Sequence, residues 1–250
     1  MKRTAAVLAL VAALMATGAE AKPRRALPPG PGTANPSVLV ATEIAFGRMA
    51  AKKGQWTAFR KFADDTGVMF VPQTVQAKAW LKGRKNPARA ITWQPHQVWM
   101  SCDGTLGVTK GAWQQSDGTV GYFTTVWKRQ KNGTYRWVME QGDTLPKPLA
   151  PPEMTSAKVG ACVQRPGATS VGTPIVVTSL PMLGGASDDG SLVWSVRVDA
   201  KCGRVVSVRL DQGGTRGLAE VFSDHVAPPR SQAATSSKSG QGVAPVACAA

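Results

Sequence analysis

The pattern of apolar and polar residues divides the segment 93–143 into four alternating runs separated by three turn signals. The turn signals are Asp103-Gly104, Asp117-Gly118 and Asn132-Gly133. Each pair accepts positive φ at both central positions, as the two-residue turns of hairpins require. The alternation has the period of a β-strand. The segment is therefore predicted to form a four-stranded antiparallel meander.

Two-residue turns at these positions also fix which residues share a face of the sheet. The first face is predicted to carry His96, Val98, Met100, Thr109, Gly111, Trp113, Tyr122, Thr124, Val126, Trp137, Met139, Gln141 and Asp143. The second face is predicted to carry Trp93, Trp99, Leu106, Val108, Lys110, Ala112, Phe123, Thr125, Trp127, Arg129, Arg136, Val138 and Glu140. Both faces are rich in apolar residues, unlike a sheet with one side in water. We expect both faces to be covered.

The residues before the meander supply helices for the first face. Asn35 suits a helix N-cap, Pro36 suits the first helical position, and Gly54 is placed to end the helix. Further along, the pattern predicts a second helix through Trp56, Phe59 and Ala63, a short strand over 68–71 and a third helix over 75–81. Apolar helix stripes must be buried against another element. The predicted fold class is α+β, with helices packed in a curved antiparallel meander, a half-open cone, over residues 37–145.

Composition changes after Asp143. A Pro-rich linker is followed by alternating runs over 191–198 and 204–210 and a third strand near 218–222. These runs predict a small all-β appendage over residues 155–225. Residues 227–250 are mostly Ser, Ala, Pro and Gly, which predicts a disordered tail.

The N-terminus has the organisation of a secretory signal. Residues 1–21 combine a basic start, an apolar run and Ala19-Glu20-Ala21 as a small-x-small cleavage site. The apolar run is shorter than the ~20 residues of a membrane-spanning helix. Cleavage after Ala21 would leave a Pro-rich leader over 22–36. We expect a periplasmic or secreted protein that does not span the membrane.

The formal net charge of +15 is compatible with an anionic partner. The basic residues are nevertheless spread along the chain, with one internal cluster over 82–89, and no nucleic-acid-binding motif is present. We therefore predict no specific nucleic-acid partner.

Four cysteines in an exported chain indicate disulfides, with three pairings to choose from. Cys162 and Cys202 both fall in the appendage, so their bridge is the preferred pairing, whereas Cys102 and Cys248 have no evident partner. There is no Cys-x-x-Cys, and His96 and His225 fall in different predicted domains. No metal and no cofactor are predicted.

Several separated motifs resemble exported SnoaL-like proteins of the nuclear transport factor 2-like (cystatin-like) superfamily, which includes ketosteroid isomerase. The motifs are the runs 42–46, 53–59 and 68–72, Trp93-Gln94-Pro95, the spacing of Gly104, Gly107, Thr109, Gly111 and Trp113, that of Tyr122 and Trp127, and Gly133-Thr134-Tyr135-Arg136-Trp137. The resemblance implies a cone whose mouth holds a small apolar molecule, and it implies dimers. It does not imply one activity, because one fold hosts many functions.

The preferred function is an exported module that binds a small, mostly apolar molecule inside the cone. The residues expected to line the ligand pocket are Phe70, Trp113, Tyr122, Trp137, Met139 and Gln141. Aromatic walls with few polar groups are the usual make-up of such pockets.

An isomerase or hydrolase-type enzyme is the first alternative. His96 and Asp143 are both predicted on the inward face, where a carboxylate among aromatic side chains could act as a base. Against this, carboxylates at strand ends are usually solvated.

A third alternative is an envelope interaction protein that uses the second sheet face. Trp99, Phe123 and Trp127 would form an apolar contact surface there. Either a second copy, giving a homodimer, or the appendage itself would cover this face.

Overall fold

The computed structural model describes residues 34–162 and 182–229 of the 250-residue chain. The predicted signal peptide over 1–21, the leader up to residue 33 and the tail from residue 230 lie outside the described residues. Within those ranges, no helix combines the length and the apolar character needed to cross a membrane.

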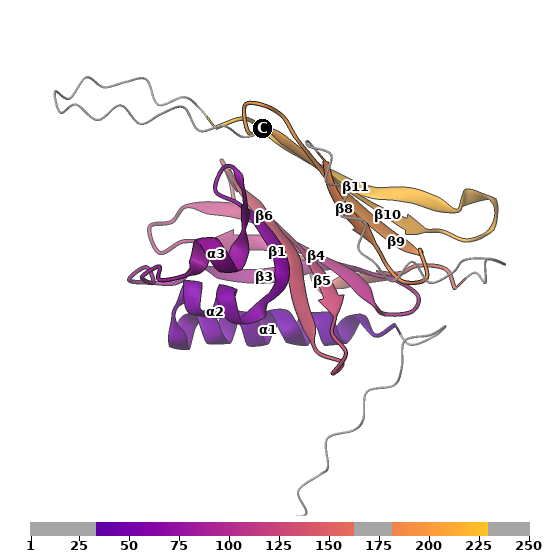
Figure 1. Ribbon diagram of the computed structural model, residues 1–250, viewed down its shortest axis with the longest axis horizontal. Helices are drawn as coiled ribbons and strands as arrows, with labels where there is room; N and C mark the ends of the chain where they lie inside the picture. The colour runs from indigo at the N-terminus through magenta and orange to yellow at the C-terminus, as the bar shows by residue number, and fades with distance from the viewer. Residues whose placement is uncertain (1–33, 163–181, 230–250) are drawn as a thin grey trace, which may run out of the picture.

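Three α-helices lie together on one face of the larger of two sheets (Figure 1). They are α1 (Pro36–Lys53), α2 (Gln55–Phe62) and α3 (Ala77–Leu81). The side chain of Asn35 accepts a hydrogen bond from the N–H of Ser37 and caps α1, while Gly54, with φ of 96°, ends it. Leu39 and Phe46 of α1 are buried in the core between the helices and the sheet.

The larger sheet has seven strands and is mixed. Its strands are β1 (Ala63–Phe70), β2 (Thr74–Gln76), β3 (Thr92–Met100), β4 (Leu106–Gln114), β5 (Val120–Arg129), β6 (Tyr135–Leu145) and β7 (Ser156–Val159). They follow the order β2-β1-β6-β5-β4-β3-β7. Strands β3 to β6 form an antiparallel meander, whereas β1 pairs parallel with β6 and β7 pairs parallel with β3.

The smaller sheet has four antiparallel strands and covers the face of the larger sheet opposite the helices (Figure 1). Its strands are β8 (Met182–Ala186), β9 (Leu192–Val198), β10 (Arg204–Asp211) and β11 (Leu218–Val226), with a 3-10 turn, η1 (Gly214–Arg216), before β11. Their order is β11-β10-β9-β8. The described chain therefore forms three layers: helices, larger sheet, smaller sheet.

This architecture corrects the predicted fold class. We expected helices packed in a four-stranded meander with a small separate appendage. The described chain is instead dominated by strand, with a seven-stranded mixed sheet and a four-stranded sheet, and three α-helices on one side. The prediction failed because the parallel strand pairs join residues far apart in the sequence, and local patterns carry no signal for such pairs.

The register of β5 also differs from the predicted one. The N–H of Gln115 donates to the carbonyl of Thr119, so the turn has three residues between the closing pair, with Gly118 at φ of 89°. A shift of one residue moves every side chain of a strand to the other face. As a result, Phe123 and Trp127 face the helices, whereas the neighbouring residues Tyr122, Thr124 and Val126 face the smaller sheet.

A bulge in β6 changes the faces once more. The pairing of β5 with β6 is irregular between Val126 and Trp127, where Trp127 pairs with Trp137 but Val126 pairs with Met139. Trp137 therefore stays on the helix-facing side, as predicted. Met139 lies on the opposite side, in the core between the two sheets.

The smaller sheet buries the outer face that was predicted to be a contact surface. Trp99, Leu106, Val108, Val126 and Met139 of the larger sheet pack in one buried cluster with residues of the smaller sheet. Those residues are Leu192, Trp194, Val196, Val198, Val206, Val208 and Leu210. Of the two coverings left open by the sequence, the structure shows the C-terminal sheet of the same chain.

Only one of the three residues predicted to form a contact surface lies on that face. Trp99 does lie in the layer between the sheets. Phe123 and Trp127 lie on the helix-facing side, so their assignment to a contact surface was wrong.

The predicted disulfide between Cys162 and Cys202 was also wrong. Cys162 is joined to Cys102 in the β3–β4 turn, at a sequence separation of 60. Cys202 is disulfide-bonded too. The pairing was wrong because we assigned Cys162 to the appendage, together with Cys202. In the structure, Cys162 follows β7 at the edge of the larger sheet.

Candidate functional site

A pocket of about 410 Å³ opens between α2, the end of β1 and the helix-facing side of the meander. Its walls are mostly apolar and aromatic: Trp56, Phe59, Met69, Phe70, Val71, Ile91, Trp93, Trp113 and Phe123. We call this cavity the aromatic pocket. Its size and lining are typical of a site for a small organic molecule.

Glycines on neighbouring strands make room for the aromatic wall. A Cβ on Gly121 would lie 2.3 Å from Cζ2 of Trp113, and a Cβ on Gly111 would lie 2.8 Å from Cε1 of Phe123. Neither glycine has positive φ, so their role is space rather than backbone conformation. The indole N–H of Trp113 donates to the carbonyl of Tyr122, which fixes the ring with its polar atom engaged.

Glu140 on β6 is the acidic group among these walls. The hydroxyl of Thr125 donates to its Oε2 at 2.6 Å, and among the described residues no donor reaches the other oxygen, Oε1. The side chain keeps some exposed surface and lines the pocket. Burial among apolar side chains raises the pKa of Glu140 well above its usual range, more than Thr125 lowers it. Glu140 therefore offers the pocket a carboxyl group that favours its neutral form.

Glu43 is a second buried carboxyl, behind the pocket wall. It accepts hydrogen bonds from Nε1 of Trp93 at 2.8 Å, from Nε1 of Trp127 at 3.2 Å and from the hydroxyl of Thr109. Burial raises the pKa of Glu43, and these three donors oppose the increase. The charge of Glu43 also raises the pKa of Glu140. Glu43 thus holds the indole ring of Trp93 in the pocket wall. Its charge also favours the neutral state of Glu140.

Gln55, at the start of α2, is a further polar group of the lining. Its Oε1 accepts the N–H of Ile91 at 3.1 Å, which ties α2 to the segment before β3. Among the described residues its amide nitrogen has no hydrogen-bond acceptor. Gln55 and Glu140 can therefore both supply donors to a bound molecule.

The sequence placed only part of the pocket. Of the six expected lining residues, Phe70, Trp113 and Gln141 line it. The other three do not: Trp137 is buried under the helices, Met139 lies between the sheets, and Tyr122 faces the smaller sheet.

His96 and Asp143 are not brought together. His96 lies at an irregularity in β3, and Asp143 lies on β6, with β4 and β5 between these strands. At the usual spacing of neighbouring strands, three steps separate the two strands by about 14 Å. Asp143 lines the aromatic pocket and His96 does not, so the structure gives no acid–base pair of these two residues.

Glu140 and Glu43 were missed for different reasons. Glu140 was assigned to the second face because the predicted register of β5 was shifted by one residue. Glu43 carried a usable signal: it falls between Leu39 and Phe46 at helical spacing, inside the apolar stripe of α1. A carboxylate in such a stripe needs buried partners.

No group of three or more His, Cys, Asp or Glu side chains in the described ranges is arranged to hold a metal ion.

Comparisons with known proteins give no family model and no curated protein that matches the chain. Among solved structures, the chain is similar to a candidate ketosteroid isomerase from Parabacteroides distasonis, with 15% identity and a TM-score of 0.37 over 49% of this chain and 98% of that chain. It is also similar to a candidate aromatic ring hydroxylase from Novosphingobium aromaticivorans, with 10% identity and a TM-score of 0.32 over 45% of this chain and 91% of that one.

A third similar structure is a nuclear transport factor 2-like protein of unknown function from Burkholderia xenovorans, with 14% identity and a TM-score of 0.30. That match covers 46% of this chain and 90% of the other. The neighbours thus include nuclear transport factor 2-like and ketosteroid isomerase-like proteins, and the likeness concerns fold alone.

Proposed function

We propose that this protein is an exported binding module that holds a small, mostly apolar molecule in the aromatic pocket. The observation that carries the proposal is Glu140, a carboxyl with a free oxygen and a raised pKa in a pocket with aromatic walls. Pockets of this kind bind through their apolar walls and orient the ligand through a few polar groups.

The polar groups of the pocket select the chemistry of the ligand. The indole nitrogens of Trp93 and Trp113 are already engaged, so those rings contribute apolar surface. A neutral Glu140 can donate its proton in a hydrogen bond to an acceptor, as can the amide of Gln55. The preferred ligand is therefore flat and apolar and carries a hydrogen-bond acceptor such as a carbonyl oxygen.

Two features support export. The disulfide between Cys102 and Cys162 is of a kind that persists in oxidising compartments. The sequence pattern of residues 1–21 is typical of a secretory signal.

General acid–base catalysis is a second candidate function, and Glu140 is the residue that favours it. Strongly shifted pKa values in clefts are frequent at catalytic sites. Asp143 lines the same pocket and is a second carboxyl for such a reaction. Turnover of a bound ketone, rather than simple binding, would distinguish this function from the first.

Two matched probes test the binding proposal. 2-Acetonaphthone is apolar with one carbonyl acceptor, and 2-ethylnaphthalene has nearly the same shape without the acceptor. We expect the wild type to bind the ketone about tenfold more tightly than the hydrocarbon. A hydrogen bond between two neutral groups contributes about 1.4 kcal/mol, which corresponds to a tenfold difference in affinity.

The variant Glu140→Leu should remove that preference while still binding the hydrocarbon, as measured by isothermal titration calorimetry. Glu153→Leu, at an exposed residue in the loop before β7, is the control and should behave as wild type. Failure of both probes to bind the wild type would refute a ligand role for the aromatic pocket.

A further inference from the structure

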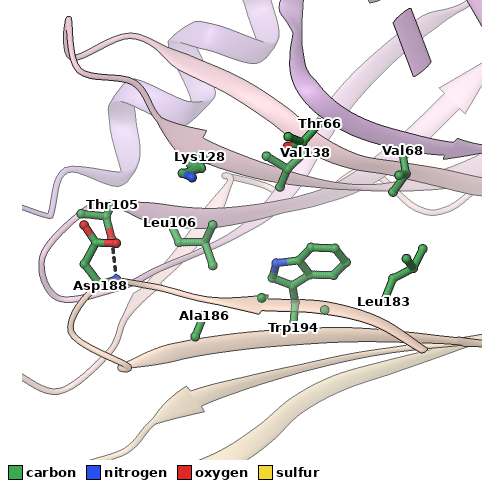
Figure 2. A pocket seen from close by; sticks show the side chains of 12 residues that line it. Thr66, Val68, Thr105, Leu106, Lys128, Val138, Leu183, Ala186, Asp188 and Trp194 are labelled. Carbon is green, nitrogen blue, oxygen red and sulfur yellow. Dashed lines mark hydrogen bonds between the residues drawn. The ribbon is translucent and has the colours of Figure 1, made fainter. Parts of the chain in front are cut away.

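A second cavity lies between the two sheets (Figure 2). The larger sheet separates it from the aromatic pocket, which lies on the helix-facing side. It has a volume of about 70 Å³. Val68, Leu106 and Val138 line it from the larger sheet, and Leu183 and Trp194 line it from the smaller sheet. We call it the inter-sheet pocket.

Gly185 of β8 keeps this space open. A Cβ on Gly185 would lie 2.8 Å from Nε1 of Trp194, which pairs with it on β9. Gly185 does not have positive φ, so the backbone does not require glycine at this position. Its absent side chain leaves room for the indole of Trp194 and for the cavity beside it.

The indole N–H of Trp194 has no acceptor among the described residues, although the residue is only 6% exposed. Figure 2 shows the ring rising from the smaller sheet toward Val138, with its nitrogen turned to the end of the pocket near Leu106. The nitrogen is not one of the fully buried polar atoms without a partner, so it keeps accessible surface in the pocket. Indole N–H groups in largely buried residues usually find a partner, and this one is open to an acceptor held in the pocket.

Lys128 provides a cation at the same end of the pocket. Its ammonium group makes no ion pair within the described parts of the chain. It lies near Asp188, whose carboxylate is exposed to solvent at the pocket mouth. Burial and the charges of Asp103 and Asp189 raise the pKa of Asp188, while Lys128 opposes the increase. An anion in the pocket would meet Lys128 and the Trp194 N–H together.

We propose that the inter-sheet pocket binds a small carboxylate that carries a short branched apolar group. Lys128 and Trp194 donate to the carboxylate, and Val68, Val138 and Leu183 contact the apolar group. The cavity has room for about two water molecules or for one short aliphatic chain, which excludes larger ring systems. This site is separate from the aromatic pocket and does not depend on the function proposed for it.

Sodium isovalerate is the probe, and 3-methyl-1-butanol is its uncharged counterpart. The readout is the indole resonance of Trp194 in ¹H–¹⁵N correlation spectra of the full chain, assigned by its loss in Trp194→Phe. We expect a saturable shift with isovalerate in the millimolar range. The alcohol should bind about tenfold more weakly, a difference of about 1.4 kcal/mol.

Three variants locate the site. Lys128→Met should weaken isovalerate about tenfold and leave the alcohol unchanged, because only the charge is lost. Lys131→Met removes an exposed lysine in the β5–β6 turn and should change nothing. Val138→Phe, at a residue of the larger sheet that lines the pocket, should fill it and abolish the shift for both probes.

Glu140→Leu should leave the isovalerate titration unchanged, which separates this site from the aromatic pocket. A pocket that holds only water would give no saturable shift of the Trp194 resonance, and the proposal would be wrong. It would also be wrong if Lys128→Met and Lys131→Met affected the titration equally.

Discussion

Asp103 and Asp189 each accept a hydrogen bond from the backbone N–H of the other, at 2.9 Å and 3.0 Å. They occupy equivalent positions in two turns with the same pattern, Ser-x-Asp-Gly-Thr/Ser-Leu, at 101–106 and 187–192. In both turns the serine hydroxyl donates to Oδ1 of the aspartate. The two hairpins therefore dock turn to turn in a reciprocal arrangement that fixes the smaller sheet on the larger one.

Loss of either aspartate should destabilise the fold. Asp103→Ala and Asp189→Ala each leave a buried or partly buried N–H without its acceptor, so we expect each to cost about 1–3 kcal/mol. The double variant should cost less than the sum, because breaking one hydrogen bond of a docked pair loosens the other. Urea unfolding of the four proteins measures this coupling.

Asp117→Ala is the matched control for the docked turns. Its carboxylate accepts the N–H of Thr119 at 2.9 Å, as Asp103 accepts that of Thr105, but Asp117 is exposed and docks on nothing described. We expect a much smaller change in stability than for either docked aspartate. Additive effects of Asp103→Ala and Asp189→Ala would contradict the reciprocal docking.

A buried ionic contact also joins the two sheets. Asp224 of β11 pairs with Lys110 and accepts a hydrogen bond from the hydroxyl of Thr124 at 2.8 Å. Asp224→Ala should cost about 3 kcal/mol, because it leaves the Lys110 charge in a mostly buried position without a partner. Thermal and urea unfolding measure the loss.

The exposed pair of Lys78 with Asp65 provides the control, since the side chain of Asp65 is 90% exposed. Asp65→Ala should change stability by less than about 1 kcal/mol. Equal effects of the two substitutions would show that Asp224 does not hold the sheets together.

The disulfide between Cys102 and Cys162 can be tested by replacing both cysteines together. Cys102→Ser with Cys162→Ser opens a loop of 60 residues and should lower stability by about 4 kcal/mol through the entropy of the unfolded chain. Peptide mapping of the unreduced wild type should recover Cys102 joined to Cys162. Recovery of Cys162 joined to Cys202 would contradict the structure.

Glu140 should make stability depend on pH. Because burial raises its folded pKa above the unfolded value of about 4.3, the folded state binds more protons between the two values. The contribution of Glu140 to stability is therefore fully present below its pKa in the unfolded state. It is lost as the pH rises through its pKa in the folded state. Each pH unit between them costs the wild type about 1.4 kcal/mol.

Glu140→Gln cannot ionise, so it should be more stable than wild type at pH 8 and similar to it at pH 4. Thermal unfolding across this range measures the difference, with Glu153→Gln as the exposed control. A constant gap between wild type and Glu140→Gln at all pH values would contradict the raised pKa.

Local signals in the sequence predicted local structure well. Asn35 caps α1 as its pattern indicates, and the Asp103-Gly104 turn gives the expected pairing of Met100 with Gly107. Asp117-Gly118 suits both a two-residue and a three-residue turn, since either accepts a glycine at positive φ. We predicted the two-residue turn, and the resulting register of β5 placed Glu140 on the face of the larger sheet opposite the helices.

The remaining misses involve residues that are distant in sequence. The parallel pairing of Ala63 with Trp137 depends on packing across the whole sheet, and no nearby turn indicates it. The partner of Cys162 could not be predicted either, because its proximity to Cys102 requires β7 to lie beside β3. Both depend on tertiary structure rather than on propensity.

The central claim, a neutral Glu140 that donates a hydrogen bond to an acceptor in the aromatic pocket, is tested most directly by the pH dependence of 2-acetonaphthone binding. Affinity for the wild type should be constant at low pH and fall by about tenfold or more as the pH rises through the pKa of Glu140. Affinity for Glu140→Gln, which keeps a donor at every pH, should stay constant. Wild-type affinity that does not change from pH 4 to pH 9, or falls equally in Glu140→Gln, would contradict the claim.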